Sequence, residues 1–305
     1  MSKFRRLSLF LLVLLTTTIW LAVIFYPNNK LRVIACDVGQ GDAILASYAN
    51  VQILVDGGPN SKVFGCLSKY MPFWDRKVEL IVNTHPQKDH FMGLIAVLKR
   101  YEVQTFMATA LDSSTQDWKA LKSEVGSRGV RVFNSVSGQK LRIGLIHLDI
   151  LWPSGEFLSE NLTPNSNLTA GESANGSNAV LGAFTSKRDP NDFSIVAILS
   201  YKDFDALLTG DVSPLQERKI VGSGMVRSVE YIKVPHHGSK NGLTKDFLDA
   251  ASPDVAVISV GKNNSYGHPH EEILKMLNDK KIKILRTDEM GDVVVETDGK
   301  EVWID

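Results

Sequence analysis

The sequence of 305 residues lacks an excess of charge of either sign. Lysine and arginine together number 34, as do aspartate and glutamate, so the formal net charge is zero at pH 7. No general positive field therefore draws the chain to nucleic acid, and any contact with a polyanion must come from a local patch. The composition, 44% hydrophobic and 22% charged, is typical of a globular protein with one large domain or two small ones.

Cysteine is also scarce, and no internal repeat is visible. Cys36 lies in a strand-like run and Cys66 in a segment with helical character. Two thiols need not pair even in an oxidising compartment, so we expect both to be buried and free. The one linker-like stretch, residues 154–191, is rich in Ser, Asn, Gly and Thr, and we expect it to form a single long loop.

Charge is missing altogether from the twenty residues Leu7 to Tyr26. At 1.5 Å per residue, a helix of this length crosses the roughly 30 Å hydrocarbon core of a bilayer. We expect residues 1–30 to form an uncleaved membrane anchor with short flanks. The alternative is a secretory signal peptide, whose apolar stretch is usually about 7–15 residues long. Three basic residues before the span favour a cytoplasmic N-terminus, which places residues 31–305 outside the cytoplasm.

Beyond the anchor, the sequence predicts strands that alternate with helices. Short β-branched runs separated by glycine-containing turns come first, and amphipathic segments follow, one of them over residues 91–101. The chain closes on three short strand-like runs. Two mixed sheets packed face to face, with helices outside, accommodate this order, so we expect an α/β fold.

Six of the seven histidines form three short clusters, and each cluster directly follows a predicted strand. The clusters are His85 with His90, His236 with His237, and His268 with His270. Asp211, at the end of "LLTGD", occupies the same kind of position. Side chains at strand ends converge on one rim of a sheet, and imidazole with carboxylate suits Zn²⁺, Mn²⁺ or Fe²⁺. We therefore expect a hydrolytic metal site, and a structural role for the isolated His147.

The chain resembles metallo-β-lactamase-fold proteins, and more narrowly the extracytoplasmic hydrolase domain of the DNA-uptake (competence) family ComEC. The resemblance covers nearly all of residues 31–305. It rests on motifs in a fixed order: "DVGQGDAIL" from Asp37, "ILVDGGP" from Ile53, "THPQKDHFMGL" from Thr84, "NDFSIVAIL" from Asn191, "LLTGD" ending at Asp211, "KVPHHGS" from Lys233 and "YGHPH" from Tyr266. The resemblance implies a metallo-β-lactamase-like αββα sandwich over residues 31–305 and a centre of one or two divalent ions, zinc or manganese.

The resemblance also implies roles for individual residues. The implied metal ligands are His85, Asp89, His90, Asp211 and His237. Asp211 would bridge two ions, Asp89 would also orient the nucleophile, and His236 and His268 would either bind metal or contact the scissile phosphate. The expected supporting residues are Asp37, Asp42, Asp56 and Gln87. The basic and hydroxyl groups expected to meet substrate phosphates are Lys88, Lys233, Ser239 and Lys240.

One position departs from the family pattern. Where the general fold carries His and the ComEC-like branch carries Asp, this chain has Gln87, whose amide oxygen is a neutral and weaker ligand. An upstream histidine that many relatives have before Asp211 has no counterpart except His147. One metal position is therefore in doubt, although Asp89 and His90 with the two downstream ligands can still hold one ion.

Three functions remain open at this point. The first is a membrane-anchored phosphodiesterase or nuclease that acts on extracytoplasmic DNA, with a separate DNA-uptake channel protein as a partner. The second is a hydrolase of the same fold with another substrate, such as a lactam, a thioester or a choline phosphoester. The third is a degenerate, non-catalytic binding module. Metal content separates the third from the others, and a panel of substrates separates the first two.

Overall fold

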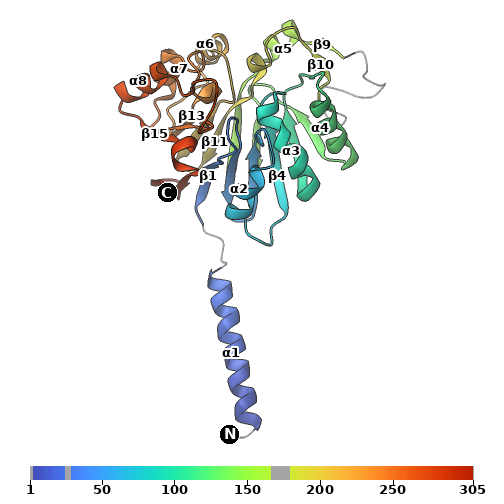
Figure 1. The fold of residues 1–305 in the computed structure, drawn as a ribbon, viewed down its shortest axis with the longest axis vertical. Helices are drawn as coiled ribbons and strands as arrows, with labels where there is room; N and C mark the ends of the chain where they lie inside the picture. The colour runs from blue at the N-terminus through green and yellow to red at the C-terminus, as the bar shows by residue number, and fades with distance from the viewer. Residues whose placement is uncertain (1–2, 25–28, 166–178, 305) are drawn as a thin grey trace.

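The computed structural model describes residues 3–24, 29–165 and 179–304, which form a long N-terminal helix and a domain of two sheets (Figure 1). The helices are α1 (Lys3–Ile24), α2 (Val63–Tyr70), α3 (Lys88–Arg100), α4 (Gln116–Ser127), α5 (Gly155–Asn161), α6 (Pro214–Gly222), α7 (Lys245–Ala251), α8 (Glu271–Asp279) and α9 (Thr287–Met290), with the 3-10 turns η1 (Pro190–Phe193) and η2 (Pro235–Gly238). The strands are β1 (Leu31–Ala35), β2 (Ile44–Tyr48), β3 (Val51–Val55), β4 (Lys77–Asn83), β5 (Glu102–Ala108), β6 (Arg131–Asn134), β7 (Lys140–Ile143), β8 (Ile146–Trp152), β9 (Thr163–Pro164), β10 (Phe184–Thr185), β11 (Val196–Tyr201), β12 (Phe204–Leu208), β13 (Tyr231–Lys233), β14 (Val255–Ile258), β15 (Lys283–Arg286), β16 (Val293–Thr297) and β17 (Val302–Ile304).

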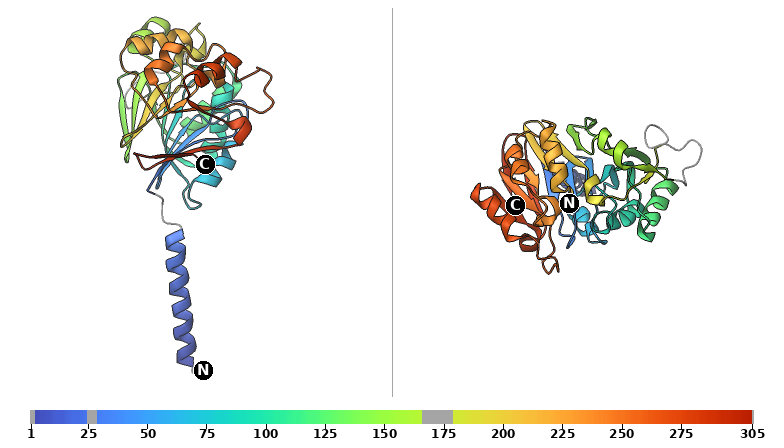
Figure 2. Two further views of the ribbon diagram at one scale, coloured as in Figure 1. Left: turned by 90° about the vertical axis from the view of Figure 1, so that its left-hand side faces the viewer. Right: turned by 90° about the horizontal axis from the view of Figure 1, so that it is seen from above.

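Two mixed sheets make up most of the domain, and β9 pairs with β10 in a small antiparallel sheet. One mixed sheet has the strand order β17-β16-β1-β2-β3-β4-β5-β6 and the other the order β15-β14-β13-β12-β11-β8-β7. In the first sheet, β3 to β6 run parallel and β1 pairs antiparallel with β2 and β16; in the second, β12 to β15 run parallel. Helices cover the outer faces (Figure 2). The predicted fold class, two mixed sheets with helices outside, is confirmed.

The alternation of side chains along each strand builds the layers. On β1, Val33 and Ala35 belong to the apolar cluster between the two sheets, and Ile34 points to the cluster beneath α2, α3 and α4. A third cluster packs α7 and α8 against the outer face of the second sheet through residues such as Phe247 and Ile273. A strand whose two faces are both buried carries apolar residues on both, which explains the near-continuous apolar runs in the sequence.

The strands of the first sheet fix which loops meet. The chain enters the domain at Leu31, the start of β1, and β3 and β4 start at the same end because β2 is antiparallel to both β1 and β3. The segments that follow β3 and β4 therefore lie at the opposite end, where residues 56 and 84–90 are found. Ligand sites of α/β sheets form at such carboxyl ends of strands.

The structure corrects three expectations from the sequence. Cys36 and Cys66 form a disulfide between the end of β1 and α2, so the expectation of free thiols was wrong. Residues 154–191 are not one loop, because α5 forms where Ser154 accepts a hydrogen bond from Phe157 N and the Phe157 ring is buried; residues 166–178 of this stretch lie outside the described part. Helix α3 starts at Lys88 rather than at residue 91.

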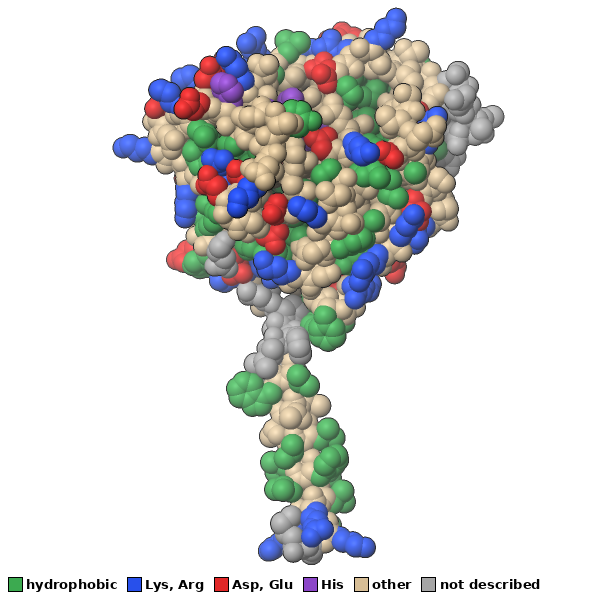
Figure 3. All heavy atoms as spheres, viewed as in Figure 1, with side chains coloured by type: hydrophobic (Ala, Val, Ile, Leu, Met, Phe, Trp, Pro, Cys, Tyr) green, Lys and Arg blue, Asp and Glu red, His purple; other side chains and the backbone are tan. Residues whose placement is uncertain are grey.

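Helix α1 is apolar enough to cross a membrane. The segment Lys3–Leu21 of this helix has a mean hydropathy of 1.6, and none of the segment is buried against the domain. Figure 3 shows apolar side chains along α1 and basic side chains near its N-terminal end. By length and composition this helix is either a membrane span or a signal segment. Phe25 and Tyr26, the last residues of the expected span, lie outside the described residues.

Candidate metal centre

Four side chains converge at the carboxyl ends of the strands. Asp89, His90, Asp211 and His237 each offer a ligand atom, and these atoms all lie within 4.8 Å of one another. The Oδ2 atom of Asp211 is 3.2 Å from His90 Nε2 and 3.3 Å from His237 Nε2. Three of the four are buried, and Asp89 is the exception, with 34% of its side chain exposed. The structure therefore brings together the four residues expected to hold one ion.

The four residues come from both sheets. Asp89 and His90 lie in the first turn of α3, directly beyond the end of β4. Asp211 follows β12, and His237 lies in η2 after β13. The site thus depends on the packing of one sheet against the other.

The backbone around the site is strained at three residues that are not glycine. Asp56, His236 and His237 have φ values of 58°, 51° and 55°. Such left-handed conformations cost about 1–3 kcal/mol each and persist where the surroundings fix them. Here the amide of Asp56 donates to Val82 O at 2.8 Å and that of His236 donates to Gly210 O at 3.3 Å.

The hydrogen bonds of the two buried ligand histidines set the direction of their lone pairs. His90 Nδ1 lies 2.8 Å from Asp56 Oδ2, and His237 Nδ1 lies 2.9 Å from the carbonyl oxygen of Ser259. Both partners can only accept, so each Nδ1 carries a proton, and when Nε2 is deprotonated its lone pair faces the site. Two imidazole lone pairs then face two carboxylates, an arrangement of acceptors alone that a cation stabilises. The donor set fits a divalent metal ion.

The charges of the site also favour the binding of a cation. Burial opposes a charge on His90 and on His237, but the neighbouring carboxylates, Asp211 foremost, raise the pKa of both rings well above the ordinary value. Burial likewise opposes the ionisation of Asp211, yet His237, His90 and Lys233 hold its pKa well below the ordinary value. The site therefore draws positive charge, which protons or a metal ion can supply.

Lys233 and Asp42 lie beneath these ligands. Lys233 is fully buried, and its ammonium contacts the carboxylate of Asp42, the carbonyl oxygen of Gly210 at 2.8 Å and Asp211 Oδ1 at 3.3 Å. The expectation that Lys233 meets substrate phosphates was therefore wrong, because its charge is paired with two carboxylates. Asp42 reaches the site because Gly41 lets its turn approach α3: a Cβ on Gly41 would lie 2.3 Å from Asp89 O.

His85 lies beside the four-residue group but outside it. Its Nδ1 is 3.0 Å from Thr84 Oγ1 and 3.2 Å from Ser194 Oγ. The single hydroxyl proton of Thr84 goes to Asp56 Oδ2 at 2.7 Å, so Thr84 accepts from His85 and the lone pair of His85 is on Nε2. This buried Nε2 has no partner among the described residues, and burial lowers the pKa of His85 to about 4. His85 is thus a neutral hydrogen-bond acceptor. It does not belong to either group of possible metal ligands among the described residues.

The rim of the site carries His236 and His268. The rings of His236 and His268 are 6.1 Å apart, and Tyr266, which is 70% exposed, stacks on His268 at 5.7 Å. Burial, followed by the charge of His237, lowers the pKa of His268, and burial also lowers that of His236. His270 has a structural place, because its Nδ1 accepts from Glu272 N at the start of α8.

The other expected residues lie around the site. Asp56 holds His90, as expected of a supporting residue. Asp37 is exposed and accepts from Gly39 N at 3.2 Å, so it shapes the glycine turn without touching the centre. Gln87 is the half-buried N-cap residue of α3, with no capping hydrogen bond from its side chain.

Two of the lysines expected to meet phosphates are engaged elsewhere. Lys88 forms an ion pair with Asp117 at 2.9 Å, and Lys240 forms one with Glu272 at 3.2 Å. Both lysines are exposed, so these pairs are weak and reversible.

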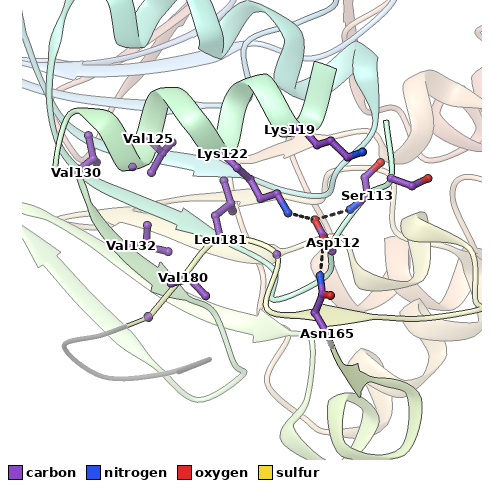
Figure 4. A pocket seen from close by; sticks show the side chains of 14 residues that line it. Asp112, Ser113, Lys119, Lys122, Val125, Val130, Val132, Asn165, Val180 and Leu181 are labelled. Carbon is purple, nitrogen blue, oxygen red and sulfur yellow. Dashed lines mark hydrogen bonds and ion pairs between the residues drawn. The ribbon is translucent and has the colours of Figure 1, made fainter. Parts of the chain in front are cut away.

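One cavity lies away from this centre. It has a volume of about 620 Å³ and is lined by α4 and residues 179–182 (Figure 4). Asp112 at its edge accepts hydrogen bonds from Lys122 and Asn165, both at 2.7 Å. None of the candidate ligands lines this cavity, so it is separate from the metal centre.

Comparison with known proteins identifies the family. The family model described as the Metallo-beta-lactamase superfamily matches residues 36–262. Among curated proteins, the chain is 25% identical over 297 residues to ComE operon protein 3 of Bacillus subtilis (strain 168), covering 90% of this chain and 34% of that protein. It is 27% identical over 274 residues to Competence protein ComA of Neisseria gonorrhoeae, covering 87% of this chain and 32% of that protein. The chain thus spans about a third of the length of these relatives.

Solved structures share the fold. The metallo-beta-lactamase fold protein YhfI from Bacillus subtilis superposes with a TM-score of 0.54 at 10% identity, covering 88% of this chain and 100% of that one. CmlA, a diiron beta-hydroxylase from Streptomyces venezuelae, superposes with a TM-score of 0.52 at 13% identity over 88% of this chain and 55% of that one. At such identities the likeness concerns the fold alone.

Proposed function

The chain belongs to the metallo-beta-lactamase superfamily, and from this membership we propose that it is a membrane-anchored, metal-dependent hydrolase that cleaves phosphodiester bonds of extracytoplasmic DNA. The observation that carries the proposal is the cluster of Asp89, His90, Asp211 and His237, in which the buried Nε2 atoms of both imidazoles have no hydrogen-bond partner among the described residues and face two carboxylates. The relatives include a competence protein, which supports a DNA substrate, and a separate DNA-uptake channel would be the partner.

These four residues would hold one divalent ion, zinc or manganese. When bound, such an ion supplies a Lewis acid and an activated water at neutral pH. Asp89, the exposed member, lies on the side from which substrate approaches. His85 would belong to a second position, which Gln87 leaves short of strong ligands, so we propose one fully held ion.

His236 and His268 would contact the substrate. Their lowered pKa values keep both rings neutral near pH 7, so each ring can donate one hydrogen bond to a phosphoryl oxygen and accept one from a water or leaving group. Their place on the rim, above the buried ligands, supports this role.

Two features support the proposed placement of the domain outside the cytoplasm. Helix α1 would anchor residues 31–305, proposed as the hydrolase domain, in the membrane. The Cys36–Cys66 disulfide suits an oxidising compartment, which supports a domain outside the cytoplasm.

A non-catalytic binding module is the second candidate. It is favoured by Gln87, because a neutral amide oxygen is a weaker metal ligand than a carboxylate or an imidazole. Such a module would bind metal or DNA without cleaving it.

The test is metal analysis of the full chain in detergent, followed by hydrolysis assays on single- and double-stranded DNA with Mn²⁺ or Zn²⁺. We expect about one tightly bound ion, and Asp211→Ala should lose it together with at least about 100-fold of kcat/KM. Adding His237→Ala should cost little more, since the ligands act as a unit. His147→Ala, an exposed residue of β8, is the matched control and should change neither quantity. Hydrolysis that survives chelation would rule out the proposal, and metal binding without hydrolysis would favour the binding module.

A further inference from the structure

The connection between α2 and β4 carries two adjacent exposed aromatic side chains. Phe73 is 67% exposed and Trp74 is 46% exposed, and their rings meet edge to face at 4.8 Å. Exposed apolar side chains that stand singly are common, but two neighbouring large aromatic residues at the tip of a loop mark an interaction surface.

This loop lies at the end of the domain where the chain enters. β4 begins at Lys77, immediately after the loop, at the same end of the first sheet as the start of β1. A direct contact supports the placement, because Arg32 Nη2 donates to the carbonyl oxygen of Tyr70 at 2.8 Å. Figures 1 and 2 show the α2–β4 connection at the end of the domain that faces α1.

The link between α1 and the domain is short. Six residues, 25–30, separate Ile24 from the first residue of β1. Even fully extended, six residues span only roughly 20 Å. A bilayer crossed by α1 would therefore lie close to this end of the domain and to the loop with Phe73 and Trp74.

The surroundings of the loop suit a lipid surface. The guanidinium of Arg76, two residues after Trp74, lies 5.9 Å from the Tyr101 ring, and that of Arg100, the residue before Tyr101, lies 5.4 Å from the Phe64 ring. An amphipathic cationic group therefore lies in the same loop as the two exposed aromatic residues. Aromatic rings favour the interface between headgroups and acyl chains, and arginine pairs with lipid phosphates. Exposed Glu102 beside them makes the charge of this edge mixed, so the rings rather than net charge would dominate binding.

We propose that the loop of residues 71–76 inserts Phe73 and Trp74 into the interfacial layer of the bilayer that α1 crosses. The inference rests on the proposed membrane anchor, and its partner is a phospholipid surface. The candidate metal centre lies at the other end of the first sheet, beyond the last residue of β4. Seven residues of strand extend roughly 20 Å. The docked domain therefore holds the centre away from the lipid and open to the aqueous side, where a polymeric substrate has access.

The test places the full chain in vesicles of phosphatidylcholine and phosphatidylglycerol that contain brominated lipids, and measures the quenching of tryptophan emission. Trp74→Phe is expected to remove part of the quenchable emission, because Trp74 contacts lipid. Trp20→Phe removes the contribution of α1 and reports the anchor separately. Tyr266→Trp, at the opposite end beside His268, is the matched control and should add emission that bromine does not quench.

Each outcome distinguishes the two proposals. If Trp20 is quenched and Trp74 is not, the anchor stands and the docking of the loop is wrong, as it would be for a loop that binds another protein. If neither is quenched, the membrane anchor itself fails. Phe73→Ser combined with Trp74→Ser gives a second readout: on vesicles, amide exchange in residues 71–76 should be faster than in the wild type, and equal exchange would overturn the docking.

Discussion

Lys233 is a fully buried lysine whose ammonium lies between two carboxylates. It contacts Asp42 and Asp211, and its position leaves Oδ2 of Asp211 free to face the imidazoles of His90 and His237. Burial opposes its charge, but Asp42 and Asp211 together raise the pKa of Lys233 above the ordinary value. Lys233 therefore offsets one negative charge beneath the site and orients a ligand without contacting the substrate.

Removal of this charge should destabilise the fold. Lys233→Met keeps the volume of the side chain but leaves two buried carboxylates without their partner, which typically costs about 3–5 kcal/mol. We expect this loss in the free energy of unfolding, measured by denaturant titration of the full chain in detergent. The matched control adds Asp42→Asn, which removes one of the orphaned charges and should restore part of the stability. A Lys233→Met protein as stable as the wild type would show that the ion pair contributes nothing net.

The convergence of the candidate ligands could be expected from the sequence, and the resemblance implied that Asp42 and Asp56 support them, but the pairing of Asp42 with Lys233 could not be predicted. His90, Asp211 and His237 follow apolar strand-like runs, and this pattern is visible in the sequence. Asp42 and Lys233 follow or end such runs too, but the sequence alone cannot show that one charge would be buried against the other. That pairing depends on how closely the two sheets pack.

At the scale of elements, the strands were easier to predict than the first turn of α3. Short β-branched runs in the sequence indicate β1 to β4, because each of these strands has two buried faces. Helix α3 was expected from residue 91, since Lys88, Asp89 and His90 interrupt the apolar pattern. These polar residues interrupt the pattern because two of them, Asp89 and His90, are candidate metal ligands. A helix without a functional site would carry apolar residues in this turn.

Gln87 gives this element a testable weakness. As the N-cap residue it has no side-chain hydrogen bond to the first turn of α3. Gln87→Asp should stabilise the helix by about 1 kcal/mol as a cap, and it should also raise metal content by adding a charged ligand. Gln87→Ser is the matched control, because serine caps equally well but adds no charged ligand.

The two effects separate in the measurements. The melting temperature should rise for both variants, and the metal content per chain should rise for Gln87→Asp alone. If Gln87→Asp lowers the metal content, the side chain at this position does not reach the centre and its assignment fails.

At the scale of the whole molecule, one disulfide, between Cys36 and Cys66, cross-links two segments of the domain, and the sequence did not predict it. Two cysteines in 305 residues carry no spacing pattern, and only the packing of α2 against β1 brings Cys36 and Cys66 together, with Cα atoms 5.7 Å apart. The same packing places the loop after α2 at the end of the domain that faces α1. The layered architecture could therefore be predicted from apolar patterning, while the pairing of Cys36 with Cys66 could not.

The disulfide and helix α1 together make a prediction about where the domain folds. The bond joins residues 30 positions apart, and closing a loop of this length typically stabilises a fold by about 3–4 kcal/mol. If α1 delivers the domain to an oxidising compartment, the full chain, denatured and alkylated without reductant, should show no free thiol. A chain without residues 1–28, kept in the cytosol, should react at both cysteines and unfold at lower denaturant. The variant with both Cys36→Ala and Cys66→Ala should match the stability of that reduced chain while keeping its metal, because neither sulfur belongs to the centre. Two free thiols in the full chain taken from intact cells would contradict a domain outside the cytoplasm.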